Sequence, residues 1–306
     1  GNVLTYEPKV EFTPELDDTI QRVRYDFEYT KAELLRERFT QTYLDWCKSL
    51  NVKSRAQAYG RGFFPLESSL DYDIPECESW TMTWLRHRLG EEMSEEDYRR
   101  GRAYTMVNKY VSSAAHLRGK RLVSCEEMTN TYTVFNMTLE LLKIGGDQTA
   151  ISGVTHSIFH GFNYSPKEAP FPGWIRYGAY YNENNNWWPY FKYYTAYKGR
   201  LASALQHGTM YADIAILNPT ADMWSTLGMQ NEPFPATTNV KYKTLVWEAI
   251  SKNGSGCDYL SESIIRDAEM KDGYLCYGPR KYKTLFLIEV ESMEPATARK
   301  LHDFVA

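Results

Sequence analysis

The sequence lacks the features that mark several large classes of protein. Its five cysteines are an odd number without metal-type spacing, which argues against a disulfide framework and against a zinc site. No apolar run is long enough to cross a bilayer, and no signal-peptide pattern is present. The net charge of −4 is too small to favour a nucleic-acid partner held through its phosphates.

Motifs typical of nucleotide-binding and acyl-transfer enzymes are also missing. The sequence contains no Walker-type phosphate loop, no dinucleotide-binding fingerprint and no Gly-x-Ser-x-Gly elbow. The glycine-rich segment 252–256 follows an expected helix rather than a strand, so we interpret it as a helix end and loop. Nucleotide binding by residues 211–306 is therefore the weakest of the functions considered.

Aromatic residues are abundant, at 15% of the chain, with 24 tyrosines and 8 tryptophans. This composition suits a protein with a large aromatic-lined cleft, and it equally suits a tyrosine-rich surface. The length of 306 residues is sufficient for two domains.

Strand and helix patterns alternate in the first part of the chain. Residues rich in β formers at 23–29 predict a strand, and a capping box that starts at Thr30 predicts a helix over 31–50. Further strands are expected at 54–59, 121–125 and 154–159, and further helices at 95–117, 132–144 and 187–207. This spacing implies parallel strands in about four βαβ-type units, either half of an eight-stranded barrel or a small open sheet.

The pattern changes near residue 210. A continuous apolar strand is expected at 212–217, followed by helices and strands that end in a helix at 296–305. This order is typical of an open, doubly wound α/β domain of the flavodoxin type. We therefore expect residues 1–209 to form a partial (β/α) barrel and residues 210–306 to form a flavodoxin-like domain.

An acidic stretch at 73–80 is the first candidate for chemistry. In an extended segment, Glu76 and Glu78 point the same way, and two like charges at that distance are costly unless a cation lies between them or one is protonated. Pro75 makes the segment a rigid rim, and Trp80 offers a flat apolar face that suits a sugar ring. The alternative is a solvated acidic loop.

Polar residues follow the expected strands, where active sites of α/β barrels lie. These residues are Asp26, Gln57, Glu126, Glu127, His156 and His160. Each has a structural alternative: an ion pair for Asp26, a helix cap for the two glutamates and a core position for the histidines. Trp187 and Trp188 stand at an expected helix start, where they would stack on sugar or place one ring in the core.

Four segments in order resemble the α-L-rhamnosidase-like glycoside hydrolases of family 106. They are Pro-Glu-Cys-Glu at 75–78, Ser-Cys-Glu-Glu-Met-Thr at 124–129, the segment 153–161 that ends in His-Gly, and Asn-Trp-Trp-Pro-Tyr-Phe at 186–191. The resemblance extends from about residue 17 to the end of the chain.

The resemblance implies a (β/α)8 catalytic barrel, inverting hydrolysis, dependence on calcium, and a periplasmic or secreted location. It makes Glu78 the general acid and Glu126 the general base, with Glu127 as the fallback for the base and Glu76 as a ligand of calcium or substrate. The family's enzymes are larger, so we expect only the second half of the barrel here and missing parts of a longer polypeptide at both ends.

The substrate implied is an oligosaccharide or polysaccharide bearing rhamnosyl side chains. Contacts to it are expected from Asp26, Gln57, Trp80, His156, His160, Trp187 and Trp188. A second hypothesis is a non-catalytic carbohydrate-binding or interaction module, in which the tryptophans stack on sugar and the acids make only hydrogen bonds.

Overall fold

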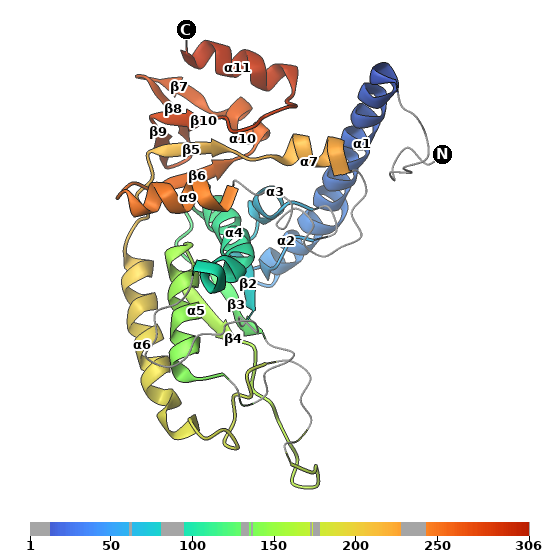
Figure 1. Ribbon diagram of the computed structural model, residues 1–306. Helices are drawn as coiled ribbons and strands as arrows, with labels where there is room; N and C mark the ends of the chain where they lie inside the picture. Colours follow the sequence, from blue (N-terminus) through green and yellow to red (C-terminus); the bar gives the residue numbers. More distant parts are fainter. Residues whose placement is uncertain are drawn as a thin grey trace. The chain divides into compact units, whose positions relative to one another are not determined.

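The computed structural model describes residues 13–60, 63–80, 95–129, 135, 137–171, 173, 178–227 and 243–305 (Figure 1). These residues form two compact units. The first unit combines residues 13–74, 113–120 and 211–305, and the second combines 75–112 and 121–210. The chain therefore passes between the units several times, and one passage, from Met210 to Tyr211, lies beside the predicted boundary at residue 209.

A helix replaces the first predicted strand. Helix α1 (Pro14–Leu35) buries Ile20, Arg24 and Glu28, which recur every four residues along one face. That helical period outweighs the β-forming residues at 23–29, because strand propensity is only a weak preference for a half-buried surface. The predicted strand at 23–29 is therefore wrong.

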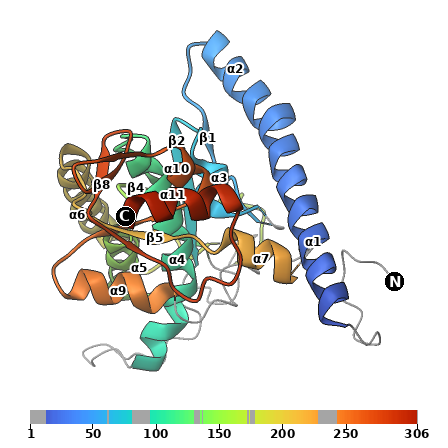
Figure 2. The same ribbon diagram turned by 90° about the horizontal axis from the view of Figure 1, so that it is seen from above.

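The same helix continues into the next predicted one. A π-helical turn, η1 (Arg36–Thr40), joins α1 to α2 (Gln41–Ser49), and Figure 2 shows them as one long helical segment. The helix expected at 31–50 is correct in type but belongs to this longer segment. The short strand expected at 54–59 is confirmed in type but covers only β1 (Arg55–Ala56).

Two small sheets complete the first unit. Strands β5 (Ile214–Leu217), β6 (Cys257–Leu260) and β10 (Thr284–Phe286) form a parallel sheet in the order β10-β5-β6. Strands β7 (Glu269–Lys271), β8 (Tyr274–Tyr277) and β9 (Arg280–Tyr282) form an antiparallel sheet. The sequence predicts a strand at 274–277, which is β8, but not its two antiparallel neighbours. The described part of this unit also contains the helices α3 (Pro65–Ser69), α7 (Thr220–Leu227), α9 (Lys243–Lys252), α10 (Glu262–Asp267) and α11 (Pro295–Val305).

A buried aspartate on β6 links three elements of the first unit. Asp258 is fully buried, and its carboxylate lies 2.7 Å from Nδ1 of His116 and 3.2 Å from Nη2 of Arg280. The Tyr282 hydroxyl donates a hydrogen bond of 3.0 Å to the same group. Burial, and next the Asp258 carboxylate, raise the pKa of Tyr282, so this hydroxyl keeps its proton and remains a donor.

The second unit contributes three parallel strands to a four-stranded sheet. They are β2 (Ile74–Trp80), β3 (Ser124–Thr129) and β4 (His156–Phe159), with β3 in the centre. Helices α5 (Leu139–Ile151) and α6 (Trp188–His207) belong to this unit, and α4 (Glu95–Leu117) contributes to both. The predicted parallel strands near 121–125 and 154–159 are confirmed. The acidic stretch at 74–80 is itself a strand, so the expectation of a rim rather than a strand there is wrong.

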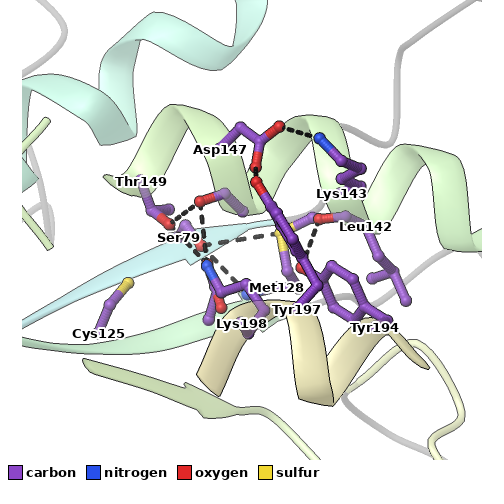
Figure 3. Close-up of polar contacts among 12 residues, drawn as sticks. Ser79, Cys125, Met128, Leu142, Lys143, Asp147, Thr149, Tyr194, Tyr197 and Lys198 are labelled. Atoms are coloured by element: carbon purple, nitrogen blue, oxygen red, sulfur yellow. Dashed lines mark hydrogen bonds and ion pairs between the residues drawn. The ribbon is translucent and has the colours of Figure 1, made fainter. Parts of the chain in front are cut away.

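Helix α5 continues past its predicted end. A helix end at Gly145 and Gly146 is expected from the sequence, yet both lie inside α5. Asp147 is therefore a helical residue that pairs with Lys143 at 2.5 Å and accepts a hydrogen bond of 2.6 Å from the Tyr197 hydroxyl (Figure 3). The two glycines serve close packing, because a Cβ at position 146 would lie 2.5 Å from the Tyr194 hydroxyl.

The packing around that glycine contains a buried ion pair. Lys198 of α6 lies 2.9 Å from Oε1 of Glu127 on β3, and the Thr149 hydroxyl of α5 donates to the same oxygen at 2.5 Å. Lys198 also donates to the backbone oxygen of Gly146 at 3.1 Å. Figure 3 shows Lys198 and Thr149 converging between the two helices and the sheet.

Removal of the Asp258 carboxylate should destabilise the fold strongly. We expect Asp258→Ala to lower the free energy of unfolding by about 3–5 kcal/mol, because it leaves the Arg280 guanidinium buried without this counter-charge. The matched control is Asp18→Ala, which removes an exposed i,i+4 partner of Arg22 and should cost less than about 0.5 kcal/mol. Urea unfolding of both variants measures the difference, and equal losses would contradict the structural role of Asp258.

Two glycine-to-alanine changes should have opposite effects. Gly146→Ala should destabilise by about 1–3 kcal/mol, because Tyr194 is hydrogen bonded to Leu142 and cannot move without disturbing the core. Gly199→Ala should stabilise by about 0.5–1 kcal/mol, because its added Cβ lies on an exposed face of α6 and meets no described atom within 4 Å. Thermal unfolding of both variants compares them, and a stable Gly146→Ala protein would disprove the close packing.

Candidate active site

The register of the sheet decides which acidic side chains share a face. Glu76 pairs with Ser124 and Glu78 pairs with Glu126 across the parallel strands β2 and β3. Residues in register on neighbouring strands point to the same face, whereas successive residues of one strand point to opposite faces. Glu76, Glu78 and Glu126 therefore lie on one face of the sheet, and Glu127 lies on the other.

Two of these carboxylates are nearly buried and held by neighbouring side chains. The Ser124 hydroxyl donates to Glu76 at 2.6 Å, and the Trp80 indole N–H donates to Glu78 at 2.7 Å. Their exposed fractions are 9% for Glu76 and 8% for Glu78. Trp80 thus orients the Glu78 carboxylate, whereas the sequence predicts only that its ring stacks on a sugar.

Three residues meet where β3 and β4 end. Oε1 of Glu126 lies 2.7 Å from the Thr129 hydroxyl and 2.9 Å from Nδ1 of His160, and the hydroxyl lies 2.8 Å from that same nitrogen. An ionised carboxylate only accepts hydrogen bonds, so the Thr129 hydroxyl donates to Glu126. Nδ1 of His160 can then donate to Glu126 and to the Thr129 oxygen if it carries the ring proton. The side chains of Glu126 and His160 are 32% and 40% exposed, which leaves this group open to a ligand.

Glu127 has a different environment. It is fully buried against α5 and α6, with Lys198 as its counter-ion. A carboxylate in that position cannot reach the face that carries Glu78 and Glu126. Both glutamates also lie within β3 rather than at a helix start, so the alternative reading of them as helix caps is wrong.

The two histidines occupy opposite ends of β4. His156 is its first residue, in register with Ser124, whereas His160 directly follows its last residue. Four residues of strand separate them by about 13 Å. His160 joins Glu126 at the carboxyl end of the strands, and the structure does not bring His156 to that group.

The tryptophan pair divides between core and surface. Trp187 is 8% exposed, and its indole N–H donates to the backbone oxygen of Met137 at 2.7 Å, so its predicted sugar contact is wrong and its core alternative is right. Trp188 is half-buried and stacks on Phe191, with ring centroids 5.5 Å apart. Its other aromatic neighbour is Phe162, whose side chain is 61% exposed.

Asp26 and Gln57 belong to the first unit. Asp26 is an exposed residue of helix α1, so the argument that placed it at a strand end no longer holds. Gln57 follows β1 and lines a cavity of about 530 Å³ in that unit.

The described residues do not fit a calcium site. Ca²⁺ takes about six to eight oxygen ligands, often from several carboxylates. Within the part of the chain that the structure describes, no group of three or more His, Cys, Asp or Glu side chains is placed to hold a metal ion. Calcium therefore stays a prediction, and no step of the chemistry is derived through it. No described helix is both long and apolar enough to cross a bilayer.

Thr129 is the one member of the strand-end group that the sequence reading missed. Its hydroxyl contacts both Glu126 and His160, as described above. The sequence gives no signal for it, because residues three positions apart on a regular strand point to opposite faces, and this contact depends on the register shift after Glu78 and the positive φ of Met128.

Known proteins resemble this chain in sequence and in fold. A protein from Formosa agariphila named “Putative beta-glucuronidase” is 25% identical over 293 residues, which is 95% of this chain and 22% of that protein. The solved structure of a rhamnosidase from Novosphingobium sp. PP1Y superposes with a TM-score of 0.67 at 21% identity, over 96% of this chain and 29% of that one.

A family 42 β-galactosidase from G. stearothermophilus superposes with a TM-score of 0.57 at 15% identity, over 97% of this chain and 42% of that one. These likenesses in structure show the fold alone. The chain thus spans less than a third of the length of the first two proteins. The sequence profile of glycoside hydrolase family 106, described as alpha-L-rhamnosidase, matches residues 13–306, and the chain therefore belongs to this family.

Proposed function

We propose that this chain supplies part of the active site of an inverting α-L-rhamnosidase-like glycoside hydrolase, with Glu126 as general base and Glu78 as general acid. The observation that carries the proposal is the in-register pairing of Glu78 with Glu126 on one face of a parallel sheet. Both lie towards the carboxyl ends of their strands, where α/β barrels bind their substrates. Membership of a glycoside hydrolase family supports the same reaction class.

A (β/α)8 barrel is the proposed context for this sheet. The three parallel strands of the second unit alternate along the chain with helices, as barrel strands do. The likeness in fold to a family 42 β-galactosidase and to a rhamnosidase supports that context. The remaining strands would come from a longer polypeptide, since the chain spans only 29% of the solved rhamnosidase.

Inversion is proposed from the family resemblance, and it sets a requirement on the two carboxyl groups. Neighbouring strands are about 4.8 Å apart, which is less than the separation of about 6.5–9.5 Å that an inverting pair needs for its water. Glu126 is held by Thr129 and by His160, which follows β4, and Glu78 is held by Trp80 of its own strand β2. An inverting pair therefore requires the two carboxyl groups to lie farther apart than the strands that carry them.

The proposed reaction balances without any further reagent. Glu126 takes a proton from a water molecule whose oxygen attacks the anomeric carbon, while the bond from that carbon to the glycosidic oxygen breaks. Glu78 gives its proton to the departing oxygen. Thr129 and His160 fix the direction of the Glu126 carboxylate, so that its proton-accepting oxygen meets the water.

The substrate we propose is an oligosaccharide or polysaccharide with terminal α-L-rhamnosyl groups, met in the periplasm or outside the cell. The description of the family as alpha-L-rhamnosidase supports rhamnose as the sugar that is cleaved off. A non-catalytic carbohydrate-binding module remains the second candidate, favoured by the half-buried Trp188 beside the exposed Phe162. Turnover separates the two, because the module would bind sugar without releasing product.

Glu126→Gln should remove turnover while leaving the fold intact. We expect kcat of the full-length enzyme on a rhamnosyl oligosaccharide to fall by about 10²–10⁴-fold, because an amide cannot take the proton from water. The matched control is Glu183→Gln, an exposed carboxyl of the same unit, which should keep the wild-type rate. Circular dichroism checks the fold of both variants. A Glu126→Gln rate near wild type would remove Glu126 from the mechanism.

Glu78→Gln should have an effect that depends on the leaving group. A general acid is needed for a poor leaving group, so we expect a loss of about 10²–10⁴-fold with a rhamnosyl oligosaccharide. With a dinitrophenyl rhamnoside, which leaves without protonation, the loss should be much smaller. Equal losses with both substrates would assign Glu78 to substrate binding, and unchanged rates with both would show that the proton comes from another group.

A further inference from the structure

The first unit contains a cavity that the proposed cleavage reaction does not use. Its volume is about 530 Å³, which is within the usual range for small-molecule sites of about 300–1,000 Å³. All residues that line it belong to the first unit, and they come mainly from α1, η1, α3, α7 and α10. The cavity is therefore a feature of this unit alone.

One side of the cavity is an aromatic wall. Tyr25 and Tyr29 of α1 stack with ring centroids 6.0 Å apart and an interplanar angle of 24°. Trp224 of α7 meets both rings, at 6.0 Å from Tyr25 and 6.4 Å from Tyr29. Tyr29 is 38% exposed, so part of this wall is open to a ligand. Flat apolar faces of this kind suit the C–H face of a sugar ring as well as other planar groups.

Two carboxyl groups among the lining residues offer hydrogen bonds. Oε1 of Glu67 accepts from the Thr220 hydroxyl at 2.6 Å, and Oε2 of Glu262 accepts from the backbone N–H of Glu294 at 2.8 Å. Burial raises the pKa of Glu67 and of Glu262, and for Glu67 the charge of Glu262 adds to this effect. A carboxyl that holds its proton more readily can donate as well as accept, which matches the two-way hydrogen bonding of a hydroxyl group.

The arginines in the cavity already have acidic partners. Arg36 and Arg118 lie 2.9 and 3.5 Å from Asp71. Arg266 lies 3.1 Å from Glu294. Asp71 is shared by two arginines, but Glu33 and Asp267 also line the cavity, so carboxyl groups outnumber the three guanidinium groups and an anionic ligand is disfavoured.

We propose that this cavity binds an uncharged saccharide unit, with its ring on the wall formed by Tyr25, Tyr29 and Trp224 and its hydroxyl groups bonded to Glu67 and Glu262. A quaternary ammonium ion would also meet aromatic faces, but it requires ionised carboxylates, which burial disfavours here. The site goes beyond the proposed cleavage, because none of its residues takes part in that reaction. It would hold a part of the carbohydrate that is not cleaved.

Binding measurements with variants of the wall test this site. Isothermal titration of L-rhamnose and methyl rhamnoside into the full-length protein should show a binding event that Tyr29→Ala weakens by at least about tenfold, which corresponds to ~1.4 kcal/mol. Tyr29→Phe keeps the ring and should keep the affinity. Tyr193→Ala, which removes an exposed ring of α6, is the matched control and should also bind as the wild type does.

Turnover distinguishes this site from the proposed active site. Tyr29→Ala should leave kcat on a small aryl rhamnoside unchanged, and Glu126→Gln should abolish turnover but keep the Tyr29-dependent binding. Equal saccharide affinity in Tyr29→Ala and wild type would overturn the proposal. So would the absence of any saccharide binding, or tighter binding of glucuronate or tetramethylammonium than of the neutral sugars.

Discussion

The parallel pairing of β3 with β2 and β4 is the constraint on which the candidate site depends. It sends Glu126 to the face that carries Glu78 and sends its neighbour Glu127 to the face covered by helices. The period of a strand is two, so a shift of one residue would exchange the two glutamates. The register therefore determines that Glu126 lies on the face open to a ligand and that Glu127 is buried and needs a counter-ion.

The buried side of the sheet protects that register. Glu127 is fully buried, and a buried carboxylate without a counter-ion would cost several kcal/mol, on the order of 3–5. Lys198 supplies the charge and Thr149 a hydrogen bond, while Gly146 lets α5 approach closely enough for both contacts. In the shifted register, the side chain facing Lys198 would no longer be Glu127. The structural ion pair thus holds the Glu126 carboxylate on the open face.

The sequence predicts the strands near 121–125 and 154–159 from local patterns, but it does not predict β2, because Pro75 and the neighbouring acids argue for a rim. It misplaces α1, whose buried positions Ile20, Arg24 and Glu28 are set by contacts with distant parts of the unit, such as the bond of Arg24 to the Thr226 backbone. It also ends α5 too early, because the need for Gly146 arises from Tyr194 of another helix. The sequence also leaves open which of Glu126 and Glu127 is the base, because the answer depends on the strand register and on the helices that cover one face of the sheet.

The acidic residues of the chain fall into two groups by the kind of partner they have. Glu127 and Asp258 are fully buried and lie beside Lys198 and Arg280, so their charges are neutralised and serve stability. Glu126 and Glu67 are instead held by hydroxyl, imidazole or amide groups, which fix the direction of a carboxyl group and leave it able to exchange a hydrogen bond with a ligand. Glu127 and Asp258 accept hydroxyl hydrogen bonds as well, from Thr149 and Tyr282, so the added Lys or Arg partner is what distinguishes these two structural acids.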